Sequence, residues 1–337
     1  MTNKLKILVT GGAGFIGSEF VRQGIDLGYK IVVIEKKKHY ASDRHRLKSV
    51  EGHYSFYEAA VERDKEKIKI EKIIKKEKPD VIVHFAAETH VDRSIQDAHP
   101  FIDTNIKGTQ NIIDLTLKYR IPKLIHFSTD EVYGEIVQGK FREDFPLEPS
   151  SPYSASKAAA DMMIKAAIRT HGLPAIIVRP SNNYGPWQYP EKFLPVILLK
   201  AFHNEKIPVY GDGSNIREWL HVSDCVKAIY LILEKGKLGE IYNIGSDVEK
   251  KNIEVVKTVL KLLDKPESLI EFVKDRPGHD IRYSVDCSKI QSLGWKTQIT
   301  FEEGLRDTVK WAKENQDWLE SKLKYLRSYW KKVYKKK

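Results

Sequence analysis

Residues 6–21, KILVTGGAGFIGSEFV, join an apolar strand pattern, a glycine-rich loop and the start of a helix. Three glycines, Gly11, Gly14 and Gly17, stand at G-x-x-G-x-x-G spacing. Gly11 permits a tight turn, Gly14 lets backbone amides approach a pyrophosphate, and Gly17 allows close packing of the helix. The N-terminus of that helix carries a partial positive charge, which favours phosphate. Because a strand precedes the loop and a helix follows it, the pattern indicates dinucleotide binding rather than a structural turn.

The first half of the chain repeats this strand–helix unit. Its short β-branched runs are typical of parallel strands that are buried on both faces. We expect strands at Lys6–Val9, Ile31–Ile34, Val81–Phe85, Lys123–Phe127 and Ala175–Val178. We expect helices at Ile16–Leu27, Lys65–Lys76, Asn105–Tyr119 and Tyr153–Thr170. The pattern predicts an α/β fold with a Rossmann-type, doubly wound parallel sheet, whose ligands bind at the carboxyl ends of the strands.

The pattern loosens after about Tyr184, where prolines and glycines between residues 186 and 213 divide it into shorter elements. We therefore predict a cofactor-binding domain at residues 1–184 and a smaller C-terminal α/β lobe at 185–322, which mainly binds the substrate. Lysines crowd the end of the chain, and we interpret residues 323–337 as a solvated, frayed basic tail.

Composition narrows the class of protein. The chain has 337 residues, a formal net charge of +11 and two cysteines, Cys225 and Cys287. Two cysteines without metal-ligand spacing give neither a disulfide framework nor a metal site. No signal pattern precedes the first strand, and no apolar run approaches the ~20 residues that span a bilayer. We expect a cytoplasmic protein with no membrane span, whose charge suits either nucleic acid or a phosphate-bearing substrate.

Glu35 ends the second predicted strand, where an acidic side chain would bind the ribose hydroxyls of NAD. An acid at this place repels the 2′-phosphate of NADP, so the sequence favours NAD. The lysines at 36–38 could accept that phosphate, which leaves NADP as an alternative. The simplest alternative to a ribose-binding role is that Glu35 is a solvated residue at the end of a strand.

Tyr153 and Lys157 stand four residues apart in a helical pattern, so their side chains share one helix face. A tyrosine has a pKa of about 10, and a base that works near neutrality needs it lowered by ~3 units. A nearby ammonium and a cationic nicotinamide both favour the phenolate. Taken alone, the pair is more often an ordinary helix face.

The run Ser128-Thr129-Asp130-Glu131 ends the strand before this helix. Adjacent residues of a regular strand point to opposite faces, but in a turn at the strand's carboxyl end Asp130 and Glu131 can reach one substrate. Two adjacent carboxyls oppose each other's ionisation, so one can stay protonated as an acid while the other acts as a base. A solvated acidic turn is the common alternative.

Longer runs resemble the dTDP-glucose 4,6-dehydratase family of the extended short-chain dehydrogenase/reductase superfamily. The resemblance is carried by residues 10–17, 86–94, 128–134, 151–157, 181–186, 249–252 and 276–280, and it extends from residue 5 to about 315. Sugar epimerases and decarboxylases share the glycine loop and Tyr-x-x-x-Lys, whereas Thr129-Asp130-Glu131 and Arg276-Pro277-Gly278-His279-Asp280 are narrower motifs. The chain departs from the family at Glu35, where Asp is usual, at Ala60-Val61, where Asp-Ile is usual, and after Lys322, where we find no counterpart.

The resemblance implies NAD, a nucleotide-sugar substrate, a homodimer and a role for each matching residue. In the implied catalytic set, Thr129 holds the sugar's O4, Asp130 is the general acid, Glu131 is the general base, Tyr153 is the base at the 4-hydroxyl, and Lys157 orients the cofactor. The implied cofactor-binding residues are Gly11, Gly14, Phe15, Ile16, Gly17, Glu35, Ala86, Ala87, Thr104, Tyr153, Lys157 and Asn183. The implied substrate-binding residues are Thr89, Thr129, Asn182, Lys192, Phe193, Pro208, Tyr210, Arg217, Asn252, Arg276 and His279.

The function that the resemblance implies is conversion of dTDP-glucose to its 4-keto-6-deoxy form. One alternative is a nucleotide-sugar 4-epimerase, which would need Tyr153 and Lys157 but no carboxyl pair. Another is a dehydratase specific for UDP-glucose, since a single methyl group distinguishes the bases. An NAD-binding protein recruited to RNA is a third, although no aromatic–basic recognition motif supports it.

We expect the dimer to pack the helices 105–119 and 153–170 against their symmetry mates. The apolar residues on these helices are Ile106, Ile112, Ile113, Leu115, Leu117, Ala158, Ala159, Met162, Met163, Ala166 and Ala167. They offer more apolar surface than one sheet face covers, and the alanines permit close approach. The alternative is that the C-terminal lobe buries both helices within one subunit.

Overall fold

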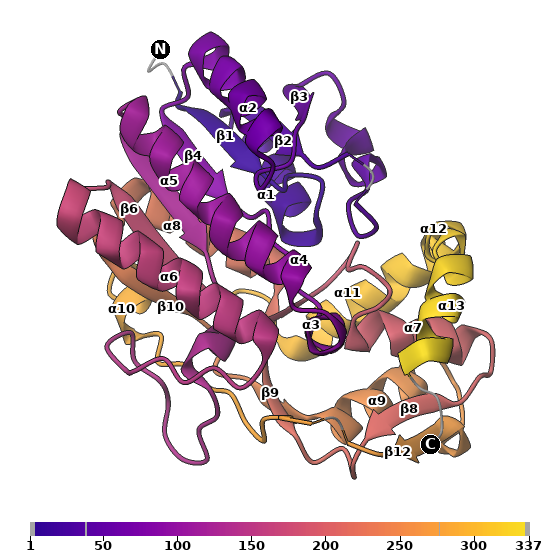
Figure 1. Ribbon diagram of the computed structural model, residues 1–337. Coiled ribbons are helices and arrows are strands. Elements are labelled where there is room, and N and C mark those ends of the chain that lie inside the picture. Colours follow the sequence, from indigo (N-terminus) through magenta and orange to yellow (C-terminus); the bar gives the residue numbers. More distant parts are fainter. Residues whose placement is uncertain (1–3, 38, 276, 334–337) are drawn as a thin grey trace.

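The apolar runs of the first half form one parallel sheet in the computed structural model, which describes residues 4–37, 39–275 and 277–333, with side chains to residue 330 (Figure 1). Its strands are β1 Lys6–Thr10, β2 Lys30–Glu35, β3 Tyr54–Glu58, β4 Val81–His84, β5 Lys123–Phe127, β6 Ala175–Pro180 and β10 Ile241–Ile244. The seven strands lie in the order β10-β6-β5-β4-β1-β2-β3, and every pair is parallel. The Rossmann-type sheet is confirmed, and the five expected strands are present within two residues at each end.

The register of the sheet brings the carboxyl ends of its central strands side by side. Thr10 pairs with His84, and His84 pairs with His126. The glycine loop after β1 and the Thr129–Glu131 run after β5 therefore leave the same edge of the sheet. This shared edge is where a ligand of a doubly wound sheet binds.

Helices cover both faces of this sheet (Figure 1). One face packs against α2 Asp64–Glu77, α5 Gly108–Lys118 and α6 Pro152–His171, and the other against α1 Phe15–Asp26, α8 Val222–Lys235 and α10 Ser288–Gln291. Each face encloses its own apolar core, with Ile70, Ile112 and Ile164 on the first and Phe20 and Ile229 on the second.

The helix expected at Asn105–Tyr119 begins earlier than the sequence indicated. After α3 Val91–Gln96, a short helix α4 His99–Phe101 passes into a π-helical stretch, Ile102–Lys107, and then into α5. The wider turns of the π-helix bury Thr104 and Asn105, whose polar side chains face the interior. Such π stretches occur often at functional sites.

The second lobe is built from two small sheets and five helices of the described chain. Its strands are β7 Asn182–Tyr184, β9 Ile216–His221 and β11 Glu249–Lys251 in one sheet, and β8 Ile207–Tyr210 with β12 Ile270–Val273 in the other. Its helices are α7 Phe193–Phe202, α9 Asn252–Leu262, α11 Phe301–Glu314, α12 Gln316–Ser321 and α13 Leu323–Val333. Between these elements the chain returns to the first lobe to add α8 and β10. The division between residues 184 and 185 stays a prediction. The large sheet contains strands from both sides of this division, since β10 follows it in the chain.

The interpretation of the C-terminus as a frayed tail is wrong for residues 323–330. Leu326, Tyr329 and Trp330 are buried in the apolar core of the second lobe, at helical spacing along α13. The lysine content of this segment obscured its apolar stripe. Residues 334–337 lie outside the described part of the chain.

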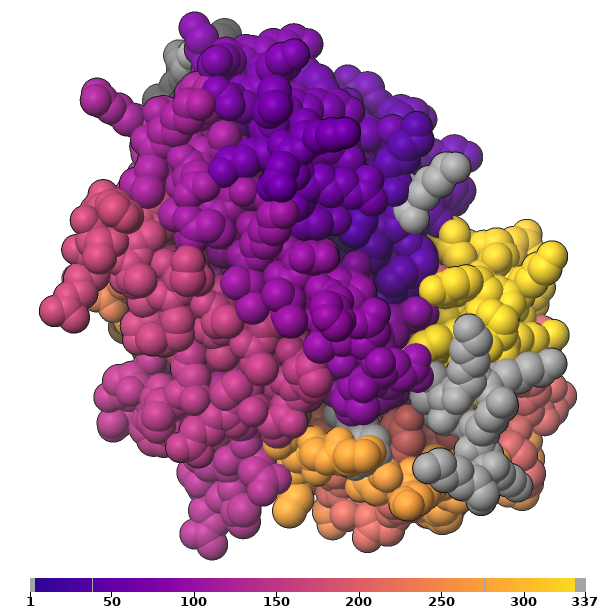
Figure 2. Space-filling model, in the orientation of Figure 1, coloured from indigo at the N-terminus to yellow at the C-terminus, as the bar shows by residue number. Residues whose placement is uncertain are grey.

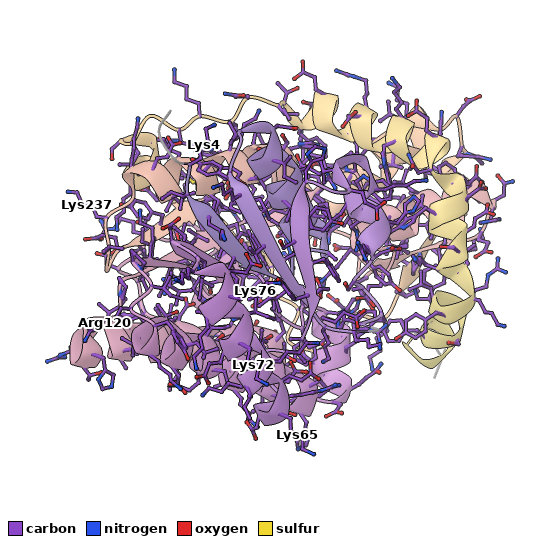
Figure 3. All side chains as sticks on the ribbon, turned by 90° about the horizontal axis from the view of Figure 1, so that it is seen from above. Lys4, Lys65, Lys72, Lys76, Arg120 and Lys237 are labelled. Atoms are coloured by element: carbon purple, nitrogen blue, oxygen red, sulfur yellow. The ribbon has the colours of Figure 1, made fainter. Side chains whose placement is uncertain are left out.

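The positive charge is spread over several elements. The labelled cations Lys4, Lys65, Lys72, Lys76, Arg120 and Lys237 project outward from different parts of the molecule (Figure 3). Lys65, Lys72 and Lys76 lie on α2, and the other three lie on separate segments of the chain. Within the described residues, no helix has the length and the apolar content to cross a membrane.

We predict that Leu326→Ala destabilises the protein by about 2–5 kcal/mol, because it leaves a cavity in the core that α13 closes. Chemical denaturation would measure the change in the free energy of unfolding. Lys324→Ala, on the exposed side of the same helix, is the matched control. Equal stability of the two variants would mean that α13 does not belong to this core.

Candidate active site

Two adjoining cavities lie along the carboxyl edge of the large sheet. The first, here called the cofactor cavity, is lined by all twelve residues that the sequence assigned to cofactor binding, and by Thr129, Asp130 and Glu131. The second, the substrate cavity, lies between this edge and the second lobe. Thr89, Glu131, Asn182 and Lys192 line both cavities, so the two spaces meet beside the carboxyl pair.

The glycine loop is shaped to admit a phosphate-bearing cofactor. Gly11 has a φ of +73°, and a Cβ there would lie 2.7 Å from the Ala86 amide nitrogen. A Cβ on Gly17 would collide with the carbonyl oxygen of Gly11. Helix α1 starts at Phe15, and among the described residues no side chain caps it. The Thr104 hydroxyl, also in the cavity wall, is buried without a hydrogen-bond partner in the described chain. These features fit NAD.

The surroundings of Glu35 bear on the choice between NAD and NADP. Its carboxylate accepts hydrogen bonds from the amides of Ala13, at 2.8 Å, and Lys36, at 3.0 Å, and burial raises its pKa. The Lys36 ammonium lies 2.7 Å from a carboxylate oxygen of Glu62, so it is already ion-paired. Lys37 is exposed beside Glu58, and Lys38 lies outside the described residues. This arrangement favours NAD, because the half-buried Lys36 is already neutralised by Glu62.

Helix α6 brings Tyr153 and Lys157 to the cavity. A capping box between Ser151 and Ser154 fixes its first turn, and the Lys157 ammonium donates to the Phe127 carbonyl at 2.7 Å. Burial lowers the pKa of Lys157 to about 8, although the nearby Asp161 opposes this shift.

The expected lowering of the tyrosine pKa by Lys157 is not observed. Burial, reinforced by the negative charge of Glu131, raises the pKa of the Tyr153 phenol well above its ordinary value. The lysine ammonium is held against the backbone of β5 instead. A positive charge from the nicotinamide ring, which the sequence analysis also invoked, therefore becomes the main means of favouring the phenolate.

Asp130 and Glu131 lie in a 3-10 turn, Asp130–Tyr133, that follows β5 directly. Asp130 is only 2% exposed, and its Oδ1 accepts a hydrogen bond from the Thr129 hydroxyl at 3.1 Å. Burial, and then the charge of Glu131, raises the pKa of Asp130 well above its usual range. Such a shift favours the protonated form of the carboxyl, which is the form that can serve as an acid.

The substrate cavity gathers the residues that were assigned to the nucleotide sugar. Its walls include Thr89, Asn182, Lys192, Phe193, Pro208, Tyr210, Arg217, Asn252 and His279. Thr129 lines the cofactor cavity instead, and Arg276 lies outside the described residues. Arg217 is held in place by donating to the Asp280 carbonyl at 3.0 Å, with its guanidinium 4.4 Å from the Tyr283 ring centroid.

Several residues of the site were missed by the sequence analysis. The Asn105 side chain accepts from the Glu88 amide at 2.9 Å and donates to the Ser156 hydroxyl at 2.8 Å, which ties the loop after β4 to α6. Tyr283 and Trp219 line the substrate cavity. An asparagine within an apolar helix was a usable signal for Asn105, since a buried amide needs partners. No local pattern marks the two aromatic residues.

A buried polar network supports α6 from beneath. Arg179 on β6 donates to Asp161 at 2.9 Å, and the Nε2 atom of His126 on β5 lies 3.5 Å from the other Asp161 oxygen. All three side chains are almost fully buried. Because Asp161 follows Lys157 by one helical turn, the network fixes the face of α6 that carries the site.

Comparison with known proteins identifies the family. The model of a family described as GDP-mannose 4,6 dehydratase matches residues 8–308. A dTDP-glucose 4,6-dehydratase from Haemophilus influenzae is 47% identical over 330 residues, which cover 91% of this chain and 97% of that protein. This chain belongs to the dTDP-glucose 4,6-dehydratase family.

Solved structures of the family agree with this assignment. A crystal structure of dTDP-glucose 4,6-dehydratase from Streptomyces venezuelae, with NAD and TYD bound, superposes with a TM-score of 0.91 at 42% identity, covering 94% of this chain and 100% of that one. A UDP-glucose 4-epimerase from Thermotoga maritima has a TM-score of 0.86 at 29% identity, covering 93% of this chain and 100% of that one. The fold is thus common to dehydratases and epimerases, while sequence similarity is greater to the dehydratase.

We predict that the protein loses stability as the pH is lowered, and that His126 accounts for part of this loss. Burial, and then the charge of Lys157, lowers the pKa of His126 to about 4 although Asp161 opposes the shift. The unfolded state binds a proton near pH 6.5, so the folded state loses stability as pH falls from 6.5 towards 4. His126→Asn should reduce the loss between pH 7 and pH 4.5 by about 2–3 kcal/mol.

Chemical denaturation of both proteins at the two pH values would measure this difference. His171→Asn, at the exposed end of α6, is the control and should keep the wild-type pH dependence. If the His126 variant also keeps it, the buried imidazole is not neutral in the folded protein.

Proposed function

We propose that this chain converts dTDP-glucose to its 4-keto-6-deoxy derivative by removing water across C5 and C6. The observation that carries the proposal is the carboxyl pair Asp130–Glu131, which shares one cavity with Tyr153 and Lys157. Relatives over nearly the whole chain are dTDP-glucose 4,6-dehydratases, which supports the same activity here.

We assign the proton transfers to four side chains. Tyr153 takes the proton of the 4-hydroxyl while Thr129 holds O4. The resulting 4-ketone acidifies the proton on C5, and Glu131 removes it. Asp130, whose protonated form burial favours, gives its proton to the departing C6 hydroxyl, so the leaving group is water. Glu131 finally returns a proton to C5.

Bound NAD supplies oxidation at C4 and the matching reduction at C6, so the cofactor is regenerated in each turnover. The glycine loop and the N-terminus of α1 would hold its pyrophosphate, and Glu35 lies where its adenosine ribose would be bound. Lys157, whose ammonium group lies against β5, would orient the nicotinamide end of the cofactor.

Two other activities use much of the same site. A nucleotide-sugar 4-epimerase needs Tyr153 and Lys157 but has no use for a buried acid beside a base, so the environment of Asp130 argues against it. A dehydratase for UDP-glucose would use identical chemistry, and the pocket gains only about 1–3 kcal/mol from the methyl group of thymine. Incubation with dTDP-glucose and with UDP-glucose, followed by alkaline absorbance of the 4-keto product, tests all three. Formation of a 4-epimer without that absorbance would sink the proposal.

We also place the enzyme in the cytoplasm. Cys225 and Cys287, the two cysteines of the chain, are both free and buried. Free thiols suit a reducing compartment.

We predict that Asp130→Asn and Glu131→Gln lower turnover by roughly 10²–10⁴-fold, because each removes one proton carrier. Oxidation at C4 should survive better than elimination, since neither carboxyl acts in the first step. Rapid mixing with substrate would then show absorbance of reduced cofactor that persists. Tyr153→Phe is the matched control, and it should form no reduced cofactor at all. If both carboxyl variants bind substrate yet also form none, the assigned division of roles is wrong.

We further propose a homodimer that packs through α6. On α5, the residues Ile112, Ile113 and Leu115 are buried against the chain's own sheet, so that part of the expected surface is already covered. On α6, Met162 and Met163 remain 52% and 39% exposed. Exposed apolar side chains of this kind on a solvent-facing helix suit a twofold contact.

We predict that Met162→Lys weakens the dimer, because it places a charge in the apolar contact. Light scattering at micromolar concentration should give a dimer mass for the wild-type protein and a lower mass for the variant. Lys72→Glu on α2 changes an exposed charge elsewhere and serves as the control. A wild-type monomer with full activity would rule the dimer out.

A further inference from the structure

The two C-terminal helices, α12 and α13, lie against the first lobe although they belong to the core of the second. In Figure 2 this yellow segment lies beside the indigo and purple surface of the first lobe. Its inner face buries Trp318, Leu319, Leu326, Tyr329 and Trp330. The same segment makes polar and aromatic contacts with Asp43, Arg46 and Arg93, which in turn contact or adjoin loops that line the cofactor cavity.

The first contact holds the loop after β2. Asp43 accepts hydrogen bonds from the Trp318 indole at 2.8 Å and from the Lys322 ammonium at 2.6 Å. Although burial acts to raise it, these bonds and the His45 amide hold the pKa of Asp43 below its usual value. Ala41 and Ser42, immediately before Asp43, line the cofactor cavity.

The second contact links this loop to the glycine loop through Arg46. The Arg46 side chain is 1% exposed and donates to the carbonyls of Ala13, at 3.0 Å, and Ala41, at 2.7 Å. It also donates to the Trp187 carbonyl at 3.0 Å, and its guanidinium lies 5.2 Å from the Trp318 ring centroid. The C-terminal segment thus supports the phosphate-binding loop through one buried side chain.

The third contact is centred on Arg93, in the helix that follows the loop after β4. Its guanidinium lies between two rings, 4.1 Å from the centroid of Tyr40 and 4.0 Å from that of Tyr329. It also forms an ion pair with the buried Glu191 at 2.8 Å. The loops that contain Tyr40 and Glu191 both contribute residues to the cofactor cavity. Stacking of a guanidinium between rings is strongest where water is excluded.

We propose that residues 316–330 form a strap that retains NAD through successive turnovers. The loop after β2, the glycine loop and the loop that contains Glu191 all contribute residues to the cofactor cavity. The strap contacts the first of these loops directly through Asp43, and it reaches the other two through Arg46 and Arg93. Release of the cofactor then requires a loop to move, which separates Arg93 from Tyr329 or Asp43 from Trp318. Retention has no kinetic cost, because a 4,6-dehydratase regenerates its cofactor. The inference rests on the proposed function, because only an enzyme that regenerates its cofactor gains from retaining it. Arg93 and Tyr329 act as positioning residues and take no part in the chemistry.

The experiment measures exchange of bound NAD for isotopically labelled NAD in the full-length protein, without any nucleotide sugar. Tyr329→Leu keeps an apolar side chain in the core but removes the ring from Arg93, and it should speed NAD dissociation by about 10-fold. Trp318→Phe keeps a ring but removes the donor to Asp43, and we expect a several-fold increase. Excess NAD in the assay should restore turnover in both variants.

Two controls separate a strap from a merely structural segment. Lys324→Ala changes the exposed side of α13 and should leave the exchange rate unchanged. Val259→Ala weakens the same apolar core from α9 and should lower stability without faster exchange. The proposal is overturned if Tyr329→Leu and Trp318→Phe both exchange NAD within about twofold of the wild-type rate, or if Val259→Ala exchanges as fast as they do. Because no sugar is present, failure of the proposed dehydratase activity would appear separately, in the product assay.

Discussion

The hydrogen bond from the Lys157 ammonium to the Phe127 carbonyl is the contact on which the geometry of the site depends. It fastens α6 to the last residue of β5, two residues before Thr129, where the Thr129–Glu131 run begins. The pair between Arg179 and Asp161 fastens the same helix to β6. A shift of one residue along α6 would turn the side chains by about 100°, and the Tyr153 phenol would leave the cavity.

Exclusion of water from the site shifts the pKa of its acidic group and the pKa of its basic group in opposite directions. Burial raises the pKa of Asp130 and lowers that of Lys157, because it disfavours the charged form of each. The protonated form of Asp130 is therefore favoured, while Lys157 donates to a backbone carbonyl that stabilises its ammonium form. Such burial costs stability, and the apolar cores on both faces of the sheet and in the second lobe offset that cost.

The two lobes meet where the chemistry is proposed to occur. Glu131 belongs to the first lobe and Lys192 to the second, and both line the two cavities. The chain crosses between the lobes more than once, since α8 and β10 return to the large sheet. The C-terminal helices add a further crossing on the outer side, through Asp43 and Arg93. The two lobes are thereby connected at several places around the cofactor cavity.

The sequence alone was sufficient to predict the parallel sheet, the glycine loop and the carboxyl pair after β5. These features depend on local patterns, because β-branched runs, glycine spacing and adjacent carboxyls are visible within a few residues. The resemblance to a known family also implied most of the residues that line the two cavities, through motifs whose members lie close together in the chain.

The tertiary structure decided the features that depend on distant contacts. Strand β10 pairs with β6, which lies some sixty residues before it in the chain. Helix α13 buries Tyr329 beside Arg93. The pKa of Tyr153 rises where proximity to Lys157 suggested that it would fall, because its burial and the nearby charge of Glu131 are properties of the packed molecule. A sequence fixes which groups are present and how they alternate, but only packing determines which of them lose water and which charges they face.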